Sequence, residues 1–248
     1  MINFFKISKR ALLPILALAL SSAGAAETPQ RIDVKQFHIA KRVENVVVPL
    51  PNEVFGALDK LGGVNWKEYV RSSKGITFNE RPRIALLLGT VIADGFIAVQ
   101  AEDAPAVKEI GQRVLGLAKF IGVGNSIVPH AKAITEAADK RNWVNVRQEL
   151  DRTQNSVQQA MTEMKDEKLS HLVSLGGWLR GTEVLTSVVN KRFSTDGAEL
   201  LHQPDLLGYF QERLQAMPEF NQKVLQEIQT ALKEVRPLID VADAGITV

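Results

Sequence analysis

The stretch IALLLGTVIADGFIAVQA, residues 84–101, is apolar on almost every side of the helix that its composition predicts. A helix of this kind either crosses a membrane or forms the centre of a helical bundle. Its 18 residues fall short of the roughly 20 that a span needs, and Asp94 in the middle would be costly in lipid. We therefore expect a buried central helix in an all-α protein and no membrane span in the mature chain.

Helical patterns continue on both sides of this stretch. Residues 143–164 place apolar side chains alternately three and four positions apart, which is typical of a helix packed lengthwise on a neighbour. No Gly/Ser-rich or charged linker follows, so the sequence predicts a single bundle domain of about eight to ten helices over residues 52–236. Residues 27–51, with the β-prone run VVVPL at 46–50, are expected to form an extended arm, and 237–248 a loose tail. The individual helices are expected at 52–61, 65–72, 81–101, 104–121, 126–140, 142–165, 169–193, 196–201, 204–217 and 218–235.

Strips of small residues predict a close crossing between the central helix and the helix over residues 169–193. Such strips let two backbones approach closely. The second helix also carries Arg180, and a charge on a buried face needs a partner. We therefore expect Asp94 and Arg180 to pair within the core. The small residues that recur every four positions are Ala85, Gly89 and Ala93 on the first helix, and Gly177 and Gly181 on the second.

The charged residues near this crossing are the candidate ligand-binding residues. Asp94, Glu102, Arg180 and Glu183 could form the floor of a pocket between helices, where bundles often hold ligands. A buried ion pair with a structural role is the alternative, because ion-pair networks also perturb pKa values. Geometry distinguishes the two, since a functional site requires these groups to converge at a pocket that solvent reaches.

Histidine spacing offers one incomplete candidate for a metal site. Glu199 and His202 match the Glu-x-x-His spacing of di-iron bundles, but such a centre needs two of these motifs and two further carboxylates. A solvated or capping role is expected for each of the four histidines. The chain has no Gly-x-Ser-x-Gly and no His-Glu-x-x-His motif. We therefore expect no metal and no cofactor, and the sequence identifies no catalytic residue.

The first 26 residues have the three-part order of an export signal peptide. A basic head precedes an apolar core at residues 11–20 (ALLPILALAL), and Ala23 and Ala25 form an A-x-A cleavage site. Cleavage after Ala25 or Ala26 would leave a mature chain that starts near Glu27. The apolar core is too short for a membrane anchor, so we expect the segment to be removed.

Charge and cysteine content exclude several classes of function. The chain has 30 Lys and Arg against 28 Asp and Glu, a formal net charge of +2. Three of the basic residues and none of the acidic ones lie in residues 1–26, which leaves the mature chain with 27 against 28 and a net charge of −1. This balance is unlike that of a nucleic-acid binder, which needs clustered cations. The absence of cysteine excludes disulfides, thiolate metal sites and cysteine nucleophiles.

Together these features predict an exported protein of the bacterial envelope, located in the periplasm, with secretion as the alternative. We expect it to bind or scaffold rather than to catalyse, with another protein or a small ligand as its partner. The alternative is a helical enzyme, or a small-ligand-binding protein, with an interhelical polar site around Asp94 and Arg180.

Overall fold

Helix α2, Arg81–Gln100, lies at the centre of the fold, as its composition predicts. Fifteen of its 20 residues are buried, because a helix without a polar face must be covered on all sides. Helices α1, α3, α5 and α6 pack around it. Among the described residues it is the one helix that is long and apolar enough to cross a membrane, and 83% of its most apolar window is covered by the rest of the protein.

The computed structural model describes residues 41–43, 46–48, 51–60, 62–72, 75–220 and 222–239. The predicted signal peptide at 1–26, most of the predicted arm and residues 240–248 of the predicted tail lie outside this part of the chain. The statements below therefore concern the described residues.

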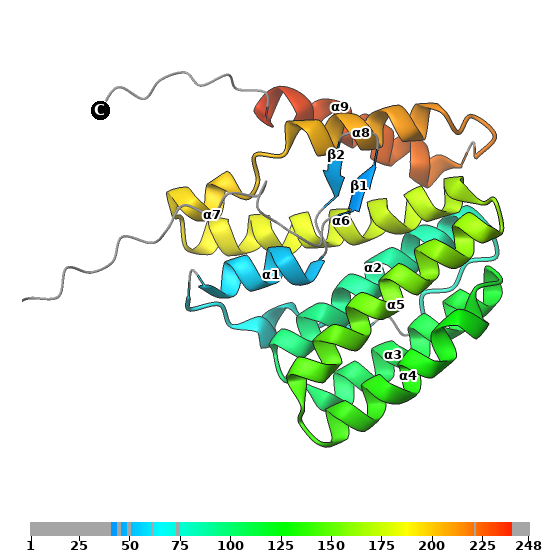
Figure 1. Ribbon diagram of the computed structural model, residues 1–248. Coiled ribbons are helices and arrows are strands. Elements are labelled where there is room, and N and C mark those ends of the chain that lie inside the picture. The colour runs from blue at the N-terminus through cyan, green and yellow to red at the C-terminus, as the bar shows by residue number, and fades with distance from the viewer. Residues whose placement is uncertain are drawn as a thin grey trace, which may run out of the picture. The chain divides into compact units, whose positions relative to one another are not determined.

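Nine α-helices and one short 3-10 helix account for nearly all the regular structure described, which confirms the predicted all-α, multi-helix fold (Figure 1). A small antiparallel hairpin precedes them, in which Lys41 of β1 (Lys41–Val43) pairs with Val48 of β2 (Val46–Val48), so the β-prone run does form a strand. The helices are α1 (Pro51–Lys60), η2 (Trp66–Tyr69), α2 (Arg81–Gln100), α3 (Ala104–Phe120), α4 (Gly124–Asp139), α5 (Trp143–Glu163), α6 (Glu167–Lys191), α7 (Thr195–Glu199), α8 (Pro204–Gln215) and α9 (Lys223–Ile239).

Helices α2 to α5 form an up-and-down array joined by very short turns (Figure 1). Each helix ends on a residue with positive φ, namely Glu102 after α2, Gly122 after α3, Arg141 after α4 and Lys165 after α5. The amide of the next residue then bonds a carbonyl five positions back, at 2.9–3.0 Å in all four turns. This is the Schellman ending, which satisfies helix carbonyls while reversing the chain.

Helices α2 and α6 cross in backbone contact, which confirms the predicted close approach. A Cβ atom added to Gly89 would lie 1.8 Å from the Val173 carbonyl oxygen, and one added to Gly176 would lie 2.0 Å from that of Leu86. The Thr90 hydroxyl donates a hydrogen bond across the crossing to the carbonyl of Gly176, at 3.3 Å. The prediction was wrong about Gly181, which has nothing within 4 Å of its added Cβ and faces a hollow beside α6 instead of the backbone of α2.

The C-terminal boundary of the bundle also differs from the prediction. Helix α9 includes Pro237 and continues to Ile239, so its last turn lies in the segment that was expected to be tail. A proline here loses an amide hydrogen bond and crowds the carbonyl of Lys233, which fits a helix that ends two residues later.

Candidate functional site

The charged residues around Asp94 form a closed ion network. Asp94 is only 2% exposed, and its two carboxylate oxygens accept hydrogen bonds from different arginines, from Arg180 Nε at 2.6 Å and from Arg71 Nε at 3.2 Å. Both arginines also contact Glu183, Arg180 Nη1 at 3.1 Å and Arg71 Nη1 at 3.2 Å. The Asp94–Arg180 pair predicted from the sequence is therefore formed, and the network balances two positive against two negative charges.

This network fastens an irregular segment to the helical core. Arg71 lies in residues 62–72, and the Arg180 guanidinium also donates to the backbone carbonyl of Tyr69 at 2.6 Å. Burial raises the pKa of Asp94 above its ordinary value, and the two guanidinium groups counter this shift only in part. A carboxylate whose oxygens are both occupied has little capacity left to bind a substrate. The geometry thus fits the structural alternative better than a pocket floor.

Glu102 does not join the other three candidate residues. It occupies the turn after α2 with a φ of 53°, eight residues beyond Asp94 and so about 12 Å further along the helix axis. Its position serves the Schellman ending of α2. Arg71, in contrast, belongs to the network but was not a candidate, because nothing in the sequence of the irregular segment indicates which helices it crosses.

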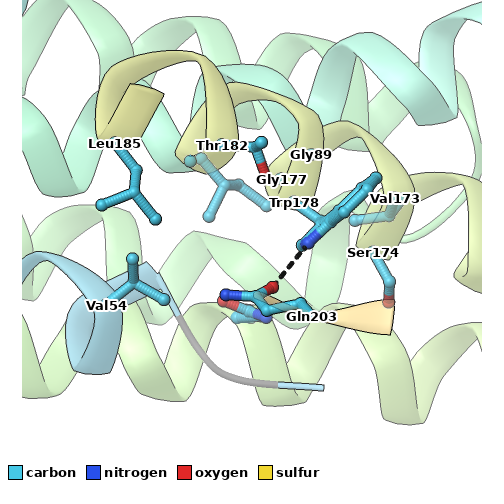
Figure 2. A pocket seen from close by; sticks show the side chains of 12 residues that line it. Val54, Gly89, Val173, Ser174, Gly177, Trp178, Thr182, Leu185 and Gln203 are labelled. Atoms are coloured by element: carbon cyan, nitrogen blue, oxygen red, sulfur yellow. Dashed lines mark hydrogen bonds between the residues drawn. The ribbon is translucent and has the colours of Figure 1, made fainter. Parts of the chain in front are cut away.

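A second candidate site is a pocket lined by residues of α1, α2, α5 and α6 and by Gln203. We call it the α6 pocket (Figure 2). Its enclosed cavity is small, about 30 Å³, and the rest of the hollow is open to solvent. Figure 2 shows Trp178 and Ser174 of α6 facing it from one side, with Val54 of α1 and Gln203 opposite. Its lining residues are Val54, Gly89, Ile92, Gln154, Val173, Ser174, Gly177, Trp178, Gly181, Thr182, Leu185 and Gln203.

Most polar groups around the α6 pocket are held in place by hydrogen bonds. The indole N–H of Trp178 donates to Gln203 Oε1 at 2.9 Å, and the amide of Gln203 donates to the carbonyl of Leu200 at 2.5 Å. Gln158 donates to the Ser174 hydroxyl at 3.4 Å. The indole ring of Trp178 is therefore fixed at the pocket wall before any ligand arrives.

Gln154 is the exception. Its side chain reaches the α6 pocket from α5 and is only 8% exposed, yet its Oε1 has no hydrogen-bond partner among the described residues. A buried amide oxygen without a donor costs about 1–3 kcal/mol. This residue was not predicted as functional, since a glutamine at one position of a long helix is an ordinary surface residue in sequence.

The incomplete metal candidate does not have the geometry that its spacing suggested. Helix α7 ends at Glu199, so His202 lies outside it, in the loop before Pro204, and the two do not share a helix face. The described part of the chain contains no group of three or more potential metal ligands.

The comparisons give no relative from which a role could be transferred. No known family model, no curated protein and no solved structure matches this chain.

Proposed function

We propose that this chain is an exported protein of the bacterial envelope that binds a small, uncharged molecule in the α6 pocket. The observation that carries the proposal is the buried, unpaired Oε1 of Gln154 at the wall of that pocket. This oxygen is itself buried, so a small shift of the Gln154 side chain is needed to expose it; a ligand with a hydrogen-bond donor would then satisfy it and recover the free energy lost by burying it. Localisation in the envelope rests on the signal pattern of residues 1–26.

The chemistry of the lining narrows the ligand class. None of the twelve described lining residues carries a charge, so a charged ligand would lose its hydration without gaining a counter-ion. Apolar side chains and the flat face of Trp178 favour a planar or compact apolar body (Figure 2). The expected ligand is therefore a small neutral molecule with one donor group, such as phenol, bound where the pocket opens to solvent.

Binding is favoured over catalysis in this pocket. The lining offers amides and hydroxyls, and it lacks a described side chain that could serve as a general base. The network around Asp94 is also a poor alternative site, because each of its charges already faces an opposite charge.

The test uses saturation-transfer NMR on the full mature chain with phenol, toluene and benzoate as probes. Phenol should bind. Toluene, which cannot donate to Gln154, should bind about 5- to 10-fold more weakly, as expected for one neutral hydrogen bond. Benzoate should not bind, because the pocket offers no cation. In Gln154→Leu, the affinity for phenol should fall to that for toluene.

A filling variant and a matched control complete the design. Gly181→Leu projects a side chain into the pocket from a position where the added Cβ meets nothing within 4 Å, so it should abolish phenol binding, and circular dichroism checks that the variant stays folded. Gly116→Leu makes the same change at an exposed position of α3 that is equally open, and it should bind phenol as wild type does. Equal binding of phenol and benzoate, or phenol binding retained in Gly181→Leu, would refute the proposal.

A further inference from the structure

His130 of α4 bridges two side chains of α5 in a partly buried site away from the α6 pocket. Its Nδ1 lies 2.9 Å from Glu149 Oε2, and its Nε2 lies 2.9 Å from the hydroxyl oxygen of Ser156. Glu149 and Ser156 are seven residues apart, about two helical turns, and so project from the same side of α5. The order carboxylate, imidazole, hydroxyl is the one that activates serine nucleophiles, and it is recognised by geometry rather than by sequence position.

The direction of the hydrogen bonds follows from the ionisation of Glu149. Burial alone would raise the pKa of Glu149, but hydrogen bonds from His130 and Arg152 outweigh burial and lower it. The carboxylate is therefore an acceptor only, which places the proton of the neutral imidazole on Nδ1. Nε2 is then left with a lone pair, and the Ser156 hydroxyl donates its hydrogen to it.

We propose that Ser156 is a nucleophile with His130 as its general base, and that it attacks small carboxylic esters at the α4–α5 surface. In this role Glu149 is a positioning residue, because it holds the imidazole in the required tautomer and does not touch the ester. The site lies outside the α6 pocket, so this activity is independent of ligand binding there.

The reaction balances with these groups and one water molecule. Ser156 Oγ forms a bond to the carbonyl carbon while its proton moves to His130 Nε2. The C–O bond to the leaving alcohol then breaks, and the imidazolium returns that proton to the alcohol. Water attacks the acyl-serine with the same base, which releases the carboxylic acid and restores Ser156.

Access and charge at the site fit a small ester. Side-chain exposure is 20% for His130 and 14% for Glu149, and Ser156 is also half-buried, so the three side chains lie at the edge of the protein surface. Arg152 lies one turn before Ser156 on the same face of α5, with 62% of its side chain exposed. Its guanidinium bonds Glu149 and carries further N–H donors that can face a developing oxyanion.

The test is covalent labelling of the full mature chain with a fluorophosphonate. Ser156 Oγ displaces fluoride from phosphorus, its proton passes to His130, and the adduct is located by peptide mass mapping. In the wild type the label should lie on Ser156 and form much faster than in the same chain unfolded in concentrated urea. His130→Gln should slow labelling by about 100-fold or more, the usual contribution of a general base.

Ser126→Ala is the matched control, since Ser126 is a half-buried serine of α4 that does not bond to His130 or Glu149. The rate of labelling in this variant should equal that of the wild type. 4-Nitrophenyl acetate should acetylate the same residue with release of nitrophenolate, and Ser156→Ala should abolish this release. The proposal would be overturned if the label were spread over other residues. It would also be overturned if the wild type were labelled no faster when folded than in urea, or if His130→Gln were labelled as fast as the wild type. The position of the label in the wild type shows whether Ser156 is the nucleophile even if a variant fails to fold.

Discussion

Replacing Gly176 by alanine tests whether the α2–α6 crossing depends on bare backbone contact. The added Cβ would lie 2.0 Å from the carbonyl oxygen and 2.9 Å from the carbonyl carbon of Leu86, and 3.1 Å from the amide nitrogen of Thr90. Carbon and oxygen approach to about 3.3 Å at closest in favourable contacts. The overlap is therefore more than about 1 Å, and it falls on helical backbone, which cannot rotate away as a side chain can.

The cost can be worked out from this overlap. Moving the helices about 1 Å apart loses a quarter to a half of the dispersion energy of the atoms that line the crossing. Overpacking of a core costs about 1–3 kcal/mol, and a clash between two backbones belongs at the upper end. Alanine recovers about 1 kcal/mol over glycine through its higher helix propensity. We expect Gly176→Ala to lower the free energy of unfolding by about 2 kcal/mol.

Gly181→Ala is the matched control, because it lies on the same helix and its added Cβ meets nothing within 4 Å. It keeps the gain in propensity without the clash, so it should raise the free energy of unfolding by up to about 1 kcal/mol. The difference between the two variants, about 3 kcal/mol, should appear in urea titrations followed by circular dichroism as a shift in midpoint with little change in slope. If Gly176→Ala proved as stable as Gly181→Ala, the inferred backbone contact would be wrong.

Two further predictions concern buried ionisable groups. Asp94→Ala leaves the 5%-exposed Arg180 with only the 59%-exposed Glu183 as counter-charge, so it should cost about 3 kcal/mol in urea unfolding. Arg71→Ala, at a 41%-exposed side chain, should cost about 1 kcal/mol or less. Equal costs would contradict the assignment of Asp94–Arg180 as the central pair. Burial raises the pKa of Tyr209 from 10.0 to about 12, so between these values the unfolded chain ionises first and folding stability is lost as pH rises. Tyr209→Phe should remove this loss, which amounts to about 2 kcal/mol between pH 10 and pH 12. An unchanged pH dependence of stability in the variant would contradict the assignment.

The helices were predictable because their signals are local. The apolar run of α2, the alternating spacing of α5 and the cap at Asp103, whose side chain accepts from the amide of Ala106 at 3.0 Å, each depend on residues close in sequence. The pairing of Asp94 with Arg180 was predictable for a different reason. Each is a charged residue on a helix whose sequence predicts burial on all sides, and a buried charge needs an opposite charge beside it.

The candidate sites were not predictable in the same way. Gln154 is notable only because its buried amide oxygen has no donor among the described residues. His130 is notable only because α4 places it between Glu149 and Ser156 of α5. Both sites depend on which residues of neighbouring helices lie side by side. The periodicity of each helix predicts its buried face but not this register. The expectation of a solvated or capping role for His130 was wrong for this reason, since the ring bonds to side chains of the neighbouring helix at both nitrogens.

The crossing and the α6 pocket have a common origin in the glycines of α6. Gly176 and Gly177 face α2, where the added Cβ atoms would meet backbone at 2.0 Å and 3.5 Å, and they let the two backbones touch. Gly181 lies one turn further along α6, where an added Cβ meets nothing within 4 Å, and it lines the α6 pocket. A side chain at Gly176 therefore acts on stability, and a side chain at Gly181 acts on the volume available to a ligand. Glycines five residues apart in α6 thus affect two properties that can be measured separately, the free energy of unfolding and the affinity for a ligand.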